Sequence, residues 1–414
     1  MATDFRQRLR GFFQPRIVED PQRRTGYFYF AAQLLTIFGI ALSNAFLGLM
    51  ILWSGWRRRL LDWSWERHRA LLAPLGALAI FYVTAVLFSF DPGESRSHLK
   101  SLLPFAAVVL APLLVRGEQE VRRIMDFLLG LITLLALHGS WQYYFTEYGT
   151  LHKRIVGGFS HVQTFSGVLL LGALLLSARI FTGRGWRRPW LWAALAVIVW
   201  TLFLTLTRGA WVALAVTLLV YLSTRAKRYL VAAAAVAMVA ALLVPAVRER
   251  MASIVDLREE SNYDRLAMID AGLYMVGERP WTGLGPGMVK ERYPIYRHPT
   301  APRFTVPHLH NAFLDLAAEG GLPLLASYLW LMGTGLVLAW RGYRREGGRA
   351  GPRADLYLGV ALGLFGFLVA GLFENNWGDS EVQRIVLFLL AIPLCLRESP
   401  ACLRESPAEN ESDG

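Results

Sequence analysis

A series of apolar segments, separated by short gaps, runs through this chain from residue 27 to residue 396. A helix needs about 20 apolar residues to match the hydrocarbon core of a bilayer. Hydrophobic residues make up 54% of the chain and charged residues only 18%, a balance that argues against a soluble domain of this length. We therefore expect residues 1–396 to form one all-α integral membrane domain.

The apolar runs predict about twelve transmembrane helices. The first run, residues 27–53, is too long for one upright helix and too short for two of usual length, and Ser43 and Asn44 interrupt it. We expect a hairpin of two short helices there, and one long tilted helix stays open as the alternative. The other predicted spans are residues 70–89, 98–115, 121–141, 162–181, 189–207, 209–223, 228–247, 311–340, 355–373 and 382–396.

Two segments differ from the apolar runs. Residues 248–309 are polar and longer than any other gap, so we expect one long periplasmic loop before the tenth helix. Residues 397–414 belong to a low-complexity repeat and predict a disordered cytoplasmic tail. The two cysteines, Cys395 and Cys402, lie together at this end and have no partner elsewhere for a disulfide framework.

The net charge of +12 reports membrane orientation rather than nucleic-acid binding, because the arginines cluster in short loops between apolar runs. Six arginines precede the first run and no convincing cleavage site follows it, so we expect a retained, cytoplasmic N-terminus. Every even-numbered connection is then cytoplasmic, and these carry Arg57–Arg59, Arg122–Arg123, Arg187–Arg188, Arg225 with Lys227 and Arg228, and Arg341 with Arg344 and Arg345. The basic exceptions on the outer side are Lys153, Arg154, Arg208 and the long loop.

Three outer arginines are candidates for anion binding. Arg208 lies between two apolar runs with almost no loop, so its guanidinium is expected at the outer membrane boundary beside a helix start, where phosphate binds well. Arg154 precedes Ile-Val-Gly-Gly-Phe, and Arg265 lies in Ser-Asn-Tyr-Asp-Arg-Leu, ahead of a short amphipathic helix. Together they could neutralise a pyrophosphate. Taken singly, each is also explained as an arginine that reaches solvent or lipid headgroups.

Two histidines, His308 and His310, end the long loop where the next helix is predicted to begin. A helix N-terminus and nearby arginines disfavour imidazolium, so such a histidine would stay neutral and could accept a proton. A capping or interfacial histidine is the structural alternative. We expect no metal, because no further Cys or His ligand set with familiar spacing accompanies the pair.

Polar residues continue into the predicted helix after the histidines. Asn311, Asp315 and Glu319 recur every four residues and therefore share one helix face. Carboxylates at this depth should face the protein interior or a water-filled cavity. They could line a cavity or pair with arginine, as could Glu374 and Asp379 in the last outer connection, and their roles stay open.

A glycine-rich run, Gly283-Leu-Gly-Pro-Gly287, lies within the long loop. It predicts a turn rather than a phosphate-binding loop, because a proline intrudes and no strand is expected before it. Residues 292–304 mix cations with aromatic side chains, which suits phosphosugars or lipid headgroups and equally a plain interfacial loop.

With these motifs the chain resembles the bacterial O-antigen ligase and polymerase superfamily, and O-antigen ligases most closely. The motifs that carry the resemblance are Thr207-Arg-Gly-Ala-Trp211, Arg265 followed by Pro280-Trp-Thr-Gly-Leu-Gly285, and His310-Asn-Ala-Phe-Leu-Asp-Leu-Ala-Ala-Glu-Gly-Gly-Leu322. Their order and the long outer loop extend the resemblance over nearly the whole chain. It implies a GT-C-like glycosyltransferase architecture in the bacterial inner membrane.

Members of this superfamily transfer a glycan from undecaprenyl pyrophosphate to a hydroxyl group at the periplasmic face, and the ligases use the lipid A core as acceptor. The resemblance implies these substrates, with membrane lipids as further partners and no cofactor. Such a transfer needs a stabilised leaving group and a deprotonated hydroxyl. We expect Arg208 and Arg265, with Arg154 as a third, to hold the pyrophosphate, and His310, which directly precedes Asn311 as in the family pattern, to act as general base.

Direct displacement would invert the anomeric centre, and no metal is required where arginines supply the neutralising charge. His308, Asn311, Asp315 and Glu319 are expected only as supporting residues. A polysaccharide polymerase stays open, although the short 142–161 connection favours a ligase, because polymerases often elaborate a second outer loop. A lipid-linked glycan or anion transporter also stays open, but it predicts ionisable residues spread through the membrane or helices broken at its midplane.

Overall fold

The computed structural model describes residues 21–58, 61, 65–148, 150, 153–183, 185–225, 244–253, 256 and 259–396. Within these ranges all regular structure is helical and no strand is present, as the apolar runs predict. Helices suit a chain in lipid because each one satisfies most of its backbone hydrogen bonds internally. The predicted tail, residues 397–414, and most of the predicted span 228–247 lie outside the described residues.

The predicted hairpin near the N-terminus is confirmed, because residues 36–39 separate two helices, α2 and α3. The helices in chain order are α2 (Pro21–Leu35), α3 (Ile40–Trp56), α4 (Trp65–Leu87), α5 (Pro92–Arg96), η2 (Ser97–Phe105), α6 (Ala106–Leu114), α7 (Gly117–Phe145), α8 (Val162–Phe181), η3 (Gly185–Arg187), α9 (Pro189–Leu204), α10 (Arg208–Arg225), α12 (Pro245–Ala252), α13 (Glu260–Glu278), α14 (Met288–Tyr296), α15 (Ala312–Arg345), η4 (Gly348–Ala350), α16 (Ala354–Gly371) and α17 (Ser380–Cys395).

Six of the described helical segments are long and apolar enough to cross a membrane: His68–Leu87, Pro92–Leu114, Gly117–Phe145, Val162–Phe181, Ala312–Arg345 and Ala354–Gly371. The shorter apolar helices are Ile40–Trp56, Pro189–Leu204 and Arg208–Ser223. The chain is thus an integral membrane protein by composition, but the predicted number of about twelve spans is not confirmed. The apolar pattern counts hydrophobic runs, whereas a crossing helix needs about 20 residues and α9, for example, has only 16.

Helix α8 forms the centre of the bundle, with every residue buried except Gln163 and Arg179. A helix buried on all sides needs no polar face, which explains why its sequence is apolar all round. Helix α16 packs closely along it through glycine: a Cβ atom at Gly366 would lie only 2.3 Å from Leu174 Cδ1. Small residues that let backbones approach are typical of helix contacts in membranes.

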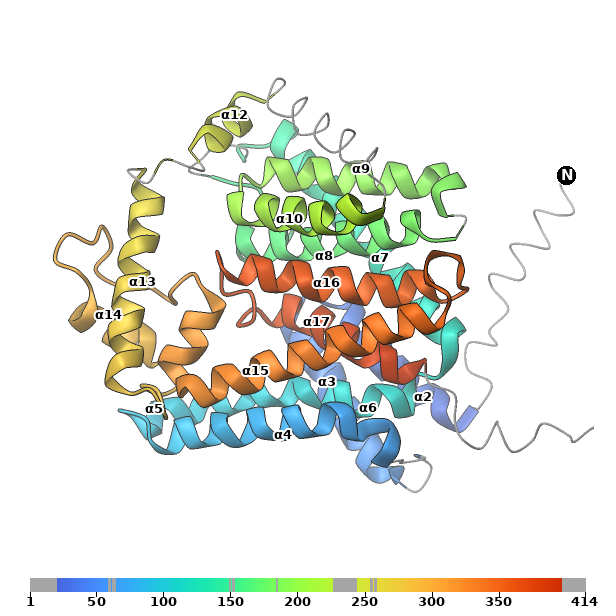
Figure 1. The fold of residues 1–414 in the computed structure, drawn as a ribbon, viewed down its shortest axis with the longest axis horizontal. Coiled ribbons are helices and arrows are strands. Elements are labelled where there is room, and N and C mark those ends of the chain that lie inside the picture. The colour runs from blue at the N-terminus through green and yellow to red at the C-terminus, as the bar shows by residue number, and fades with distance from the viewer. Residues whose placement is uncertain are drawn as a thin grey trace, which may run out of the picture.

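The two ends of the bundle differ. At one end, arginines that the sequence predicts as cytoplasmic form ion pairs, Arg23 with Glu120 at 2.7 Å and Arg122 with Asp355 at 2.6 Å. At the other end, α13 runs crosswise to the bundle helices, α14 lies beside it, and α12 precedes it in the chain (Figure 1). The segment predicted as one long loop, residues 248–309, therefore contains helices, and Arg265 lies within α13 rather than ahead of a helix.

Helix α15 breaks at Gly321, which has a φ of 76° and a ψ of 173°, and Pro323 follows the break. A break leaves backbone groups of the helix without their usual partners, a cost that is high away from water. Residues 280–287 supply those partners. They include the glycine-rich run, residues 283–287, that the sequence predicts as a turn.

Three backbone hydrogen bonds join this turn to the break. The N–H groups of Leu284 and Gly285 donate to the carbonyl oxygens of Ala318 and Glu319 at 2.8 and 2.9 Å, and Leu322 N–H donates to the Pro280 carbonyl at 2.7 Å. The turn therefore holds the first part of α15, which carries the candidate site, in a fixed direction relative to the rest of the helix.

Replacing Gly321 by alanine should disrupt this junction. The new Cβ would lie 2.6 Å from the Trp281 carbonyl carbon, and a φ of 76° with a ψ of 173° is a conformation that almost only glycine adopts, which costs another residue about 1–3 kcal/mol. We expect Gly321→Ala to lower the thermal unfolding midpoint of the purified protein. Gly333→Ala in the same helix is the control, because nothing lies within 4 Å of its added Cβ. Equal midpoints for both variants would contradict this account of the break.

Candidate active site

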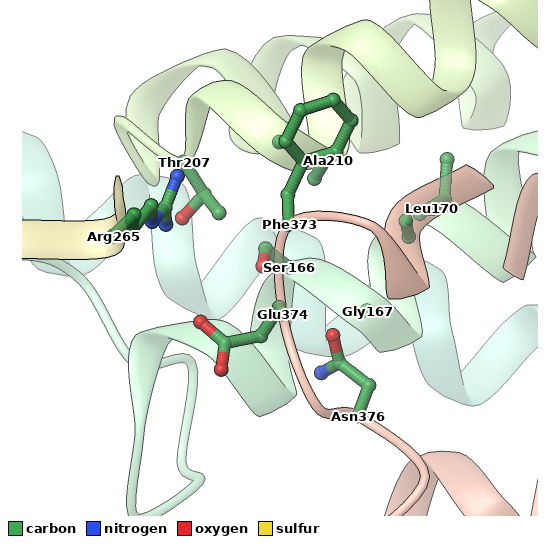
Figure 2. A pocket seen from close by; sticks show the side chains of 11 residues that line it. Ser166, Gly167, Leu170, Thr207, Ala210, Arg265, Phe373, Glu374 and Asn376 are labelled. Carbon is green, nitrogen blue, oxygen red and sulfur yellow. The ribbon is translucent and has the colours of Figure 1, made fainter. Parts of the chain in front are cut away.

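The candidate residues that the sequence places far apart meet at the end of the bundle where α13 lies (Figure 1). The charges of Arg208, Arg265 and Glu374 all act on Arg154, which shows that these groups are neighbours. Figure 2 shows Arg265 reaching in from α13 toward Thr207, and Glu374 on the loop that follows α16, around one small cavity. Arg154, Arg208 and Arg265 thus belong to one cluster.

His310 and Glu374 form a hydrogen-bonded pair at the edge of this cluster. His310 Nδ1 lies 2.9 Å from each carboxylate oxygen of Glu374, and only 13% of the histidine side chain and 9% of the glutamate side chain are exposed. Because a carboxylate only accepts, we assign the proton to Nδ1, which leaves Nε2 as the acceptor of the neutral ring. Among the described residues Nε2 has no hydrogen-bond partner, so it is available to a substrate proton.

Glu374 is the anionic member of this pair. Burial acts to raise its pKa, but the hydrogen bond and charge of His310, with the charges of His308 and Arg265, lower the pKa overall. A buried carboxylate that stays ionised stabilises a positive charge on the adjacent imidazole ring. This arrangement suits a histidine that must accept a proton and hold it briefly.

His308 supports the pair and is a weaker candidate for proton transfer. Its Nε2 lies 3.5 Å from Glu374 Oε1, and its Nδ1 accepts the backbone N–H of His310 at 3.3 Å. Burial lowers the pKa of His308 to about 4, so this ring stays neutral at physiological pH. Its described contacts hold the backbone and the carboxylate in place.

Asp315 joins the two chain segments that carry the pair. One carboxylate oxygen accepts the Leu309 N–H at 2.9 Å, and the other accepts the Asn375 side-chain amide at 2.5 Å. Asn311 caps the same helix, since its side chain accepts the N–H groups of residues 313 and 314. Asn311 and Asp315, the first two polar residues of the predicted helix face, therefore hold the start of α15 in place.

Glu319, the third member of that face, does not reach the histidine pair. Its Oε1 accepts the Gly287 N–H at 2.8 Å, so it holds the turn at residues 280–287 against α15. Asp379 likewise has a structural contact, because it accepts hydrogen bonds from Thr164 and Asn376, both at 3.0 Å. Of the carboxylates with open roles, only Glu374 contacts His310 directly.

Backbone strain marks the same place. Among the described residues, Leu206 and His310 are the non-glycine residues with positive φ, at 55° and 50°. Leu206 lies two residues before Arg208, at the turn from α9 into α10. Bulky side chains in the left-handed region cost free energy, and such positions cluster at functional sites.

Arg208 begins α10, as the sequence predicts, but its guanidinium is fully engaged by the protein. It donates to the Ser253 carbonyl at 2.7 Å, to Glu259 at 2.9 Å, and to side-chain oxygens of Ser261 and Asn262 at 2.7 and 2.8 Å. Only 6% of Arg208 is exposed. In this conformation Arg208 therefore anchors the start of α13 instead of facing the lipid boundary.

Glu259 is the acidic centre of that anchor. Besides Arg208, it pairs with Arg250 at 2.8 Å, and it caps α13 by accepting the Asn262 N–H. Burial acts to raise the pKa of Glu259, but hydrogen bonds from Arg208, Ser261 and Arg250 lower it to about 2. The Glu259 carboxylate thus lies between two guanidinium groups, and guanidinium groups bind carboxylate and phosphate oxygens in the same geometry.

Arg154 and Arg265 differ from Arg208, because neither forms a hydrogen bond or ion pair with any residue that the structure describes. Burial lowers the pKa of Arg154 to about 10, and the charges of Arg250, Arg265 and Arg208 act in the same direction. Burial also lowers the pKa of Arg265. Two half-buried cations without bonded counter-charges favour an anion between them.

The cavity beside Arg265 is small, about 10 Å³, which is room for one water molecule. Glycines allow the 373–376 loop to lie against α8 and α10: a Cβ at Gly167 would lie 2.9 Å from Asn376 Nδ2, and a Cβ at Gly209 would lie 2.6 Å from Phe373 Cβ. The cavity is therefore tightly closed in this conformation.

The sequence predicts no metal site for lack of a further ligand, but the structure brings Glu374 to the two histidines. His308, His310 and Glu374 each offer a ligand atom, and these atoms lie within 4.8 Å of one another. This set could hold a divalent cation. An ion would have to replace the proton that His310 and Glu374 share, since ligands bind metal in their deprotonated form.

The sequence missed the groups that bond to the candidate residues. Glu259, Ser253 and Asn375 gave no signal, because their importance comes from partners 45 to 60 residues away along the chain. Glu374 gave a weak signal as a carboxylate in a short outer connection. The structure assigns it a specific partner.

These features define a class: a helical membrane protein with a cationic cluster and a histidine–carboxylate pair gathered at one end of its bundle. A family model described as O-antigen ligase matches residues 192–329, which include Arg208, Arg265 and His310. This is the family that the sequence motifs suggest, and over these residues the match indicates an O-antigen ligase-like or polymerase-like function. No curated protein matches the chain. Arg154 and Glu374 lie outside the matched residues, so their assignment rests on geometry.

The anchor predicts that Arg208→Lys destabilises the α12–α13 segment. Lysine keeps the charge but cannot form the same set of hydrogen bonds, because it lacks the planar fork. We expect faster hydrogen exchange at the amides of residues 259–265 and a lower unfolding midpoint. Arg248→Lys, at an exposed arginine in α12, is the control and should change neither. Unchanged exchange in Arg208→Lys would mean that the anchor is dispensable.

Proposed function

We propose that this protein is an O-antigen ligase, which moves a glycan from undecaprenyl pyrophosphate to a hydroxyl group of the lipid A core at the periplasmic face of the inner membrane. The observation that carries the proposal is the His310–Glu374 pair beside two half-buried arginines that lack bonded counter-charges among the described residues. A base and a diphosphate-binding cluster are the two groups that this transfer requires.

In the proposed reaction, His310 Nε2 takes the proton of the acceptor hydroxyl as its oxygen attacks the anomeric carbon. The bond between that carbon and the pyrophosphate oxygen breaks, and its electron pair stays on the leaving undecaprenyl pyrophosphate. Attack from the side opposite the leaving group inverts the anomeric centre. Glu374 holds the imidazole in the required tautomer and stabilises the imidazolium that forms.

Arginines neutralise the charge that develops on the leaving diphosphate. We propose Arg154 and Arg265 as its first ligands, because neither has to leave a protein partner. Arg208 joins them when the diphosphate takes the place of Glu259. This exchange also opens the closed cavity, since Glu259 precedes α13, the helix that carries Arg265.

The position of the candidate site at one end of the bundle supports an enzyme over a transporter. The cationic cluster, the histidine pair and the strained backbone positions lie at one end of the bundle, whereas a transporter site is expected near the membrane midplane. The ion-paired arginines at the other end fit the predicted cytoplasmic face and cytoplasmic termini.

The function is tested with purified protein, a glycan on undecaprenyl pyrophosphate and lipid A core, with and without a chelator. We expect glycan on lipid A core in both conditions. Glycan that lengthens on the lipid carrier instead would identify a polymerase, and transfer lost with chelator and restored by a divalent cation would assign the histidine–glutamate set to metal binding.

His310→Ala should lower the rate of transfer by about 10²–10⁴-fold, the usual contribution of a general base. Glu374→Gln should give a smaller loss in kcat with little change in donor KM, because it removes the charge that supports the imidazolium. His308→Ala is the matched control and should retain most transfer. Size-exclusion elution establishes that each variant is folded. Comparable rates for His310→Ala and His308→Ala would remove the proposed base.

Glu259→Gln tests the exchange at Arg208. Without its charge, residue 259 competes less well with a diphosphate, so we expect a lower donor KM with kcat nearly unchanged. Glu260→Gln, at the exposed neighbouring position, should leave donor KM unchanged. A raised donor KM in Glu259→Gln, with a normal value in Glu260→Gln, would show that Glu259 supports donor binding instead of opposing it.

A further inference from the structure

A second, much larger cavity lies at the opposite end of α15 from His310. Its volume is about 650 Å³, and it is formed where the end of α15, the start of α16 and the end of α17 meet. The residues that line it are Leu338, Arg341, Gly342, Arg345, Glu346, Arg353, Tyr357, Pro393 and Leu396. None of them takes part in the candidate active site.

Arginine dominates the polar side of this cavity. Arg341 and Arg345 are four residues apart on α15 and so share one face of its last turns. Both are exposed, and neither has an ion pair or hydrogen bond with a residue that the structure describes. Arg353 pairs with Glu346 at 2.8 Å. Three guanidinium groups thus face one carboxylate, which leaves an excess of positive charge.

The other side of the cavity is apolar and built by close packing. Tyr357 packs against α15 at Gly342, where an added Cβ would lie 2.2 Å from the tyrosine ring. Leu338 continues the face of Arg341 and Arg345 one turn toward the middle of the helix, and Leu396 closes the end of α17. The cavity therefore combines cations with an apolar wall at the end of membrane-spanning helices.

We propose that this cavity binds the phosphate group of an anionic membrane lipid, with Arg341 and Arg345 as its ligands. A guanidinium fork binds phosphate oxygens in pairs, and basic cavities between membrane helices on the cytoplasmic side suit anionic headgroups. The apolar wall fits the lipid part nearest the headgroup. A free phosphate ion offers the same oxygens but no apolar part, so the two sources are separable by experiment.

The test uses the full-length protein purified in a neutral detergent. Bound lipids are counted by native mass spectrometry, and the unfolding midpoint is measured with added phosphatidylglycerol, phosphatidylcholine or inorganic phosphate, because a ligand that binds the folded state raises the midpoint. The test variant is Arg341→Gln with Arg345→Gln. The control is Arg344→Gln, at an exposed arginine on the same turn that does not line the cavity.

We expect phosphatidylglycerol, but not phosphatidylcholine, to bind and raise the midpoint, and the double variant to weaken this binding by about tenfold or more. Arg344→Gln should behave as the unmodified protein. A rise with inorganic phosphate that equals the rise with phosphatidylglycerol, and is lost in the double variant, would assign the site to a free anion. Equal phosphatidylglycerol binding by the double variant and by Arg344→Gln would overturn the proposal. These outcomes do not depend on glycan transfer.

Discussion

The geometry of the candidate active site depends on the carboxylate of Asp315. One oxygen holds the backbone before His310, and the other holds Asn375, next to Glu374. A loop histidine in a left-handed conformation would relax without such support, because the conformation is strained. The two hydrogen bonds fix the backbones on both sides of the His310–Glu374 pair, so the pair needs little reorganisation when a proton moves.

Charge is arranged differently at the two ends of the bundle. At one end, Arg122 pairs with Asp355, while Arg341 and Arg345 are exposed to solvent. At the other end, four guanidinium groups, those of Arg154, Arg208, Arg250 and Arg265, surround two carboxylates and leave a surplus of positive charge. A surplus in a poorly solvated place is unfavourable until an anion arrives. Glu259 reduces this cost in the structure by pairing with Arg208 and Arg250.

Helix α15 links these features, because it begins at the histidine pair, breaks at Gly321 and ends at the arginine-lined cavity. The turn at residues 280–287 forms hydrogen bonds with backbone groups at the break in the helix. These bonds set the direction of the first ten residues of α15. Gly283 lets this turn lie against α15, since an added Cβ would lie 2.4 Å from the Glu319 backbone. The same helix therefore carries both proposed binding sites at its two ends.

The sequence by itself determined the all-helical membrane character, the positions of most helices, the sidedness of the arginines and the choice of His310 and Arg265 as candidates. The helices and the arginine pattern follow from local properties, since apolar length and the positive-inside rule act segment by segment, whereas His310 was chosen over His308 from the family resemblance. Only the tertiary structure decided that Glu374 pairs with His310, that Glu259 forms an ion pair with Arg208, and that the long loop contains α13. The predicted number of about twelve spans is not confirmed, because six of the described helical segments are long and apolar enough to cross a membrane. Side chains 51 and 64 residues apart come together through helix packing, and no local pattern in the chain encodes those distances.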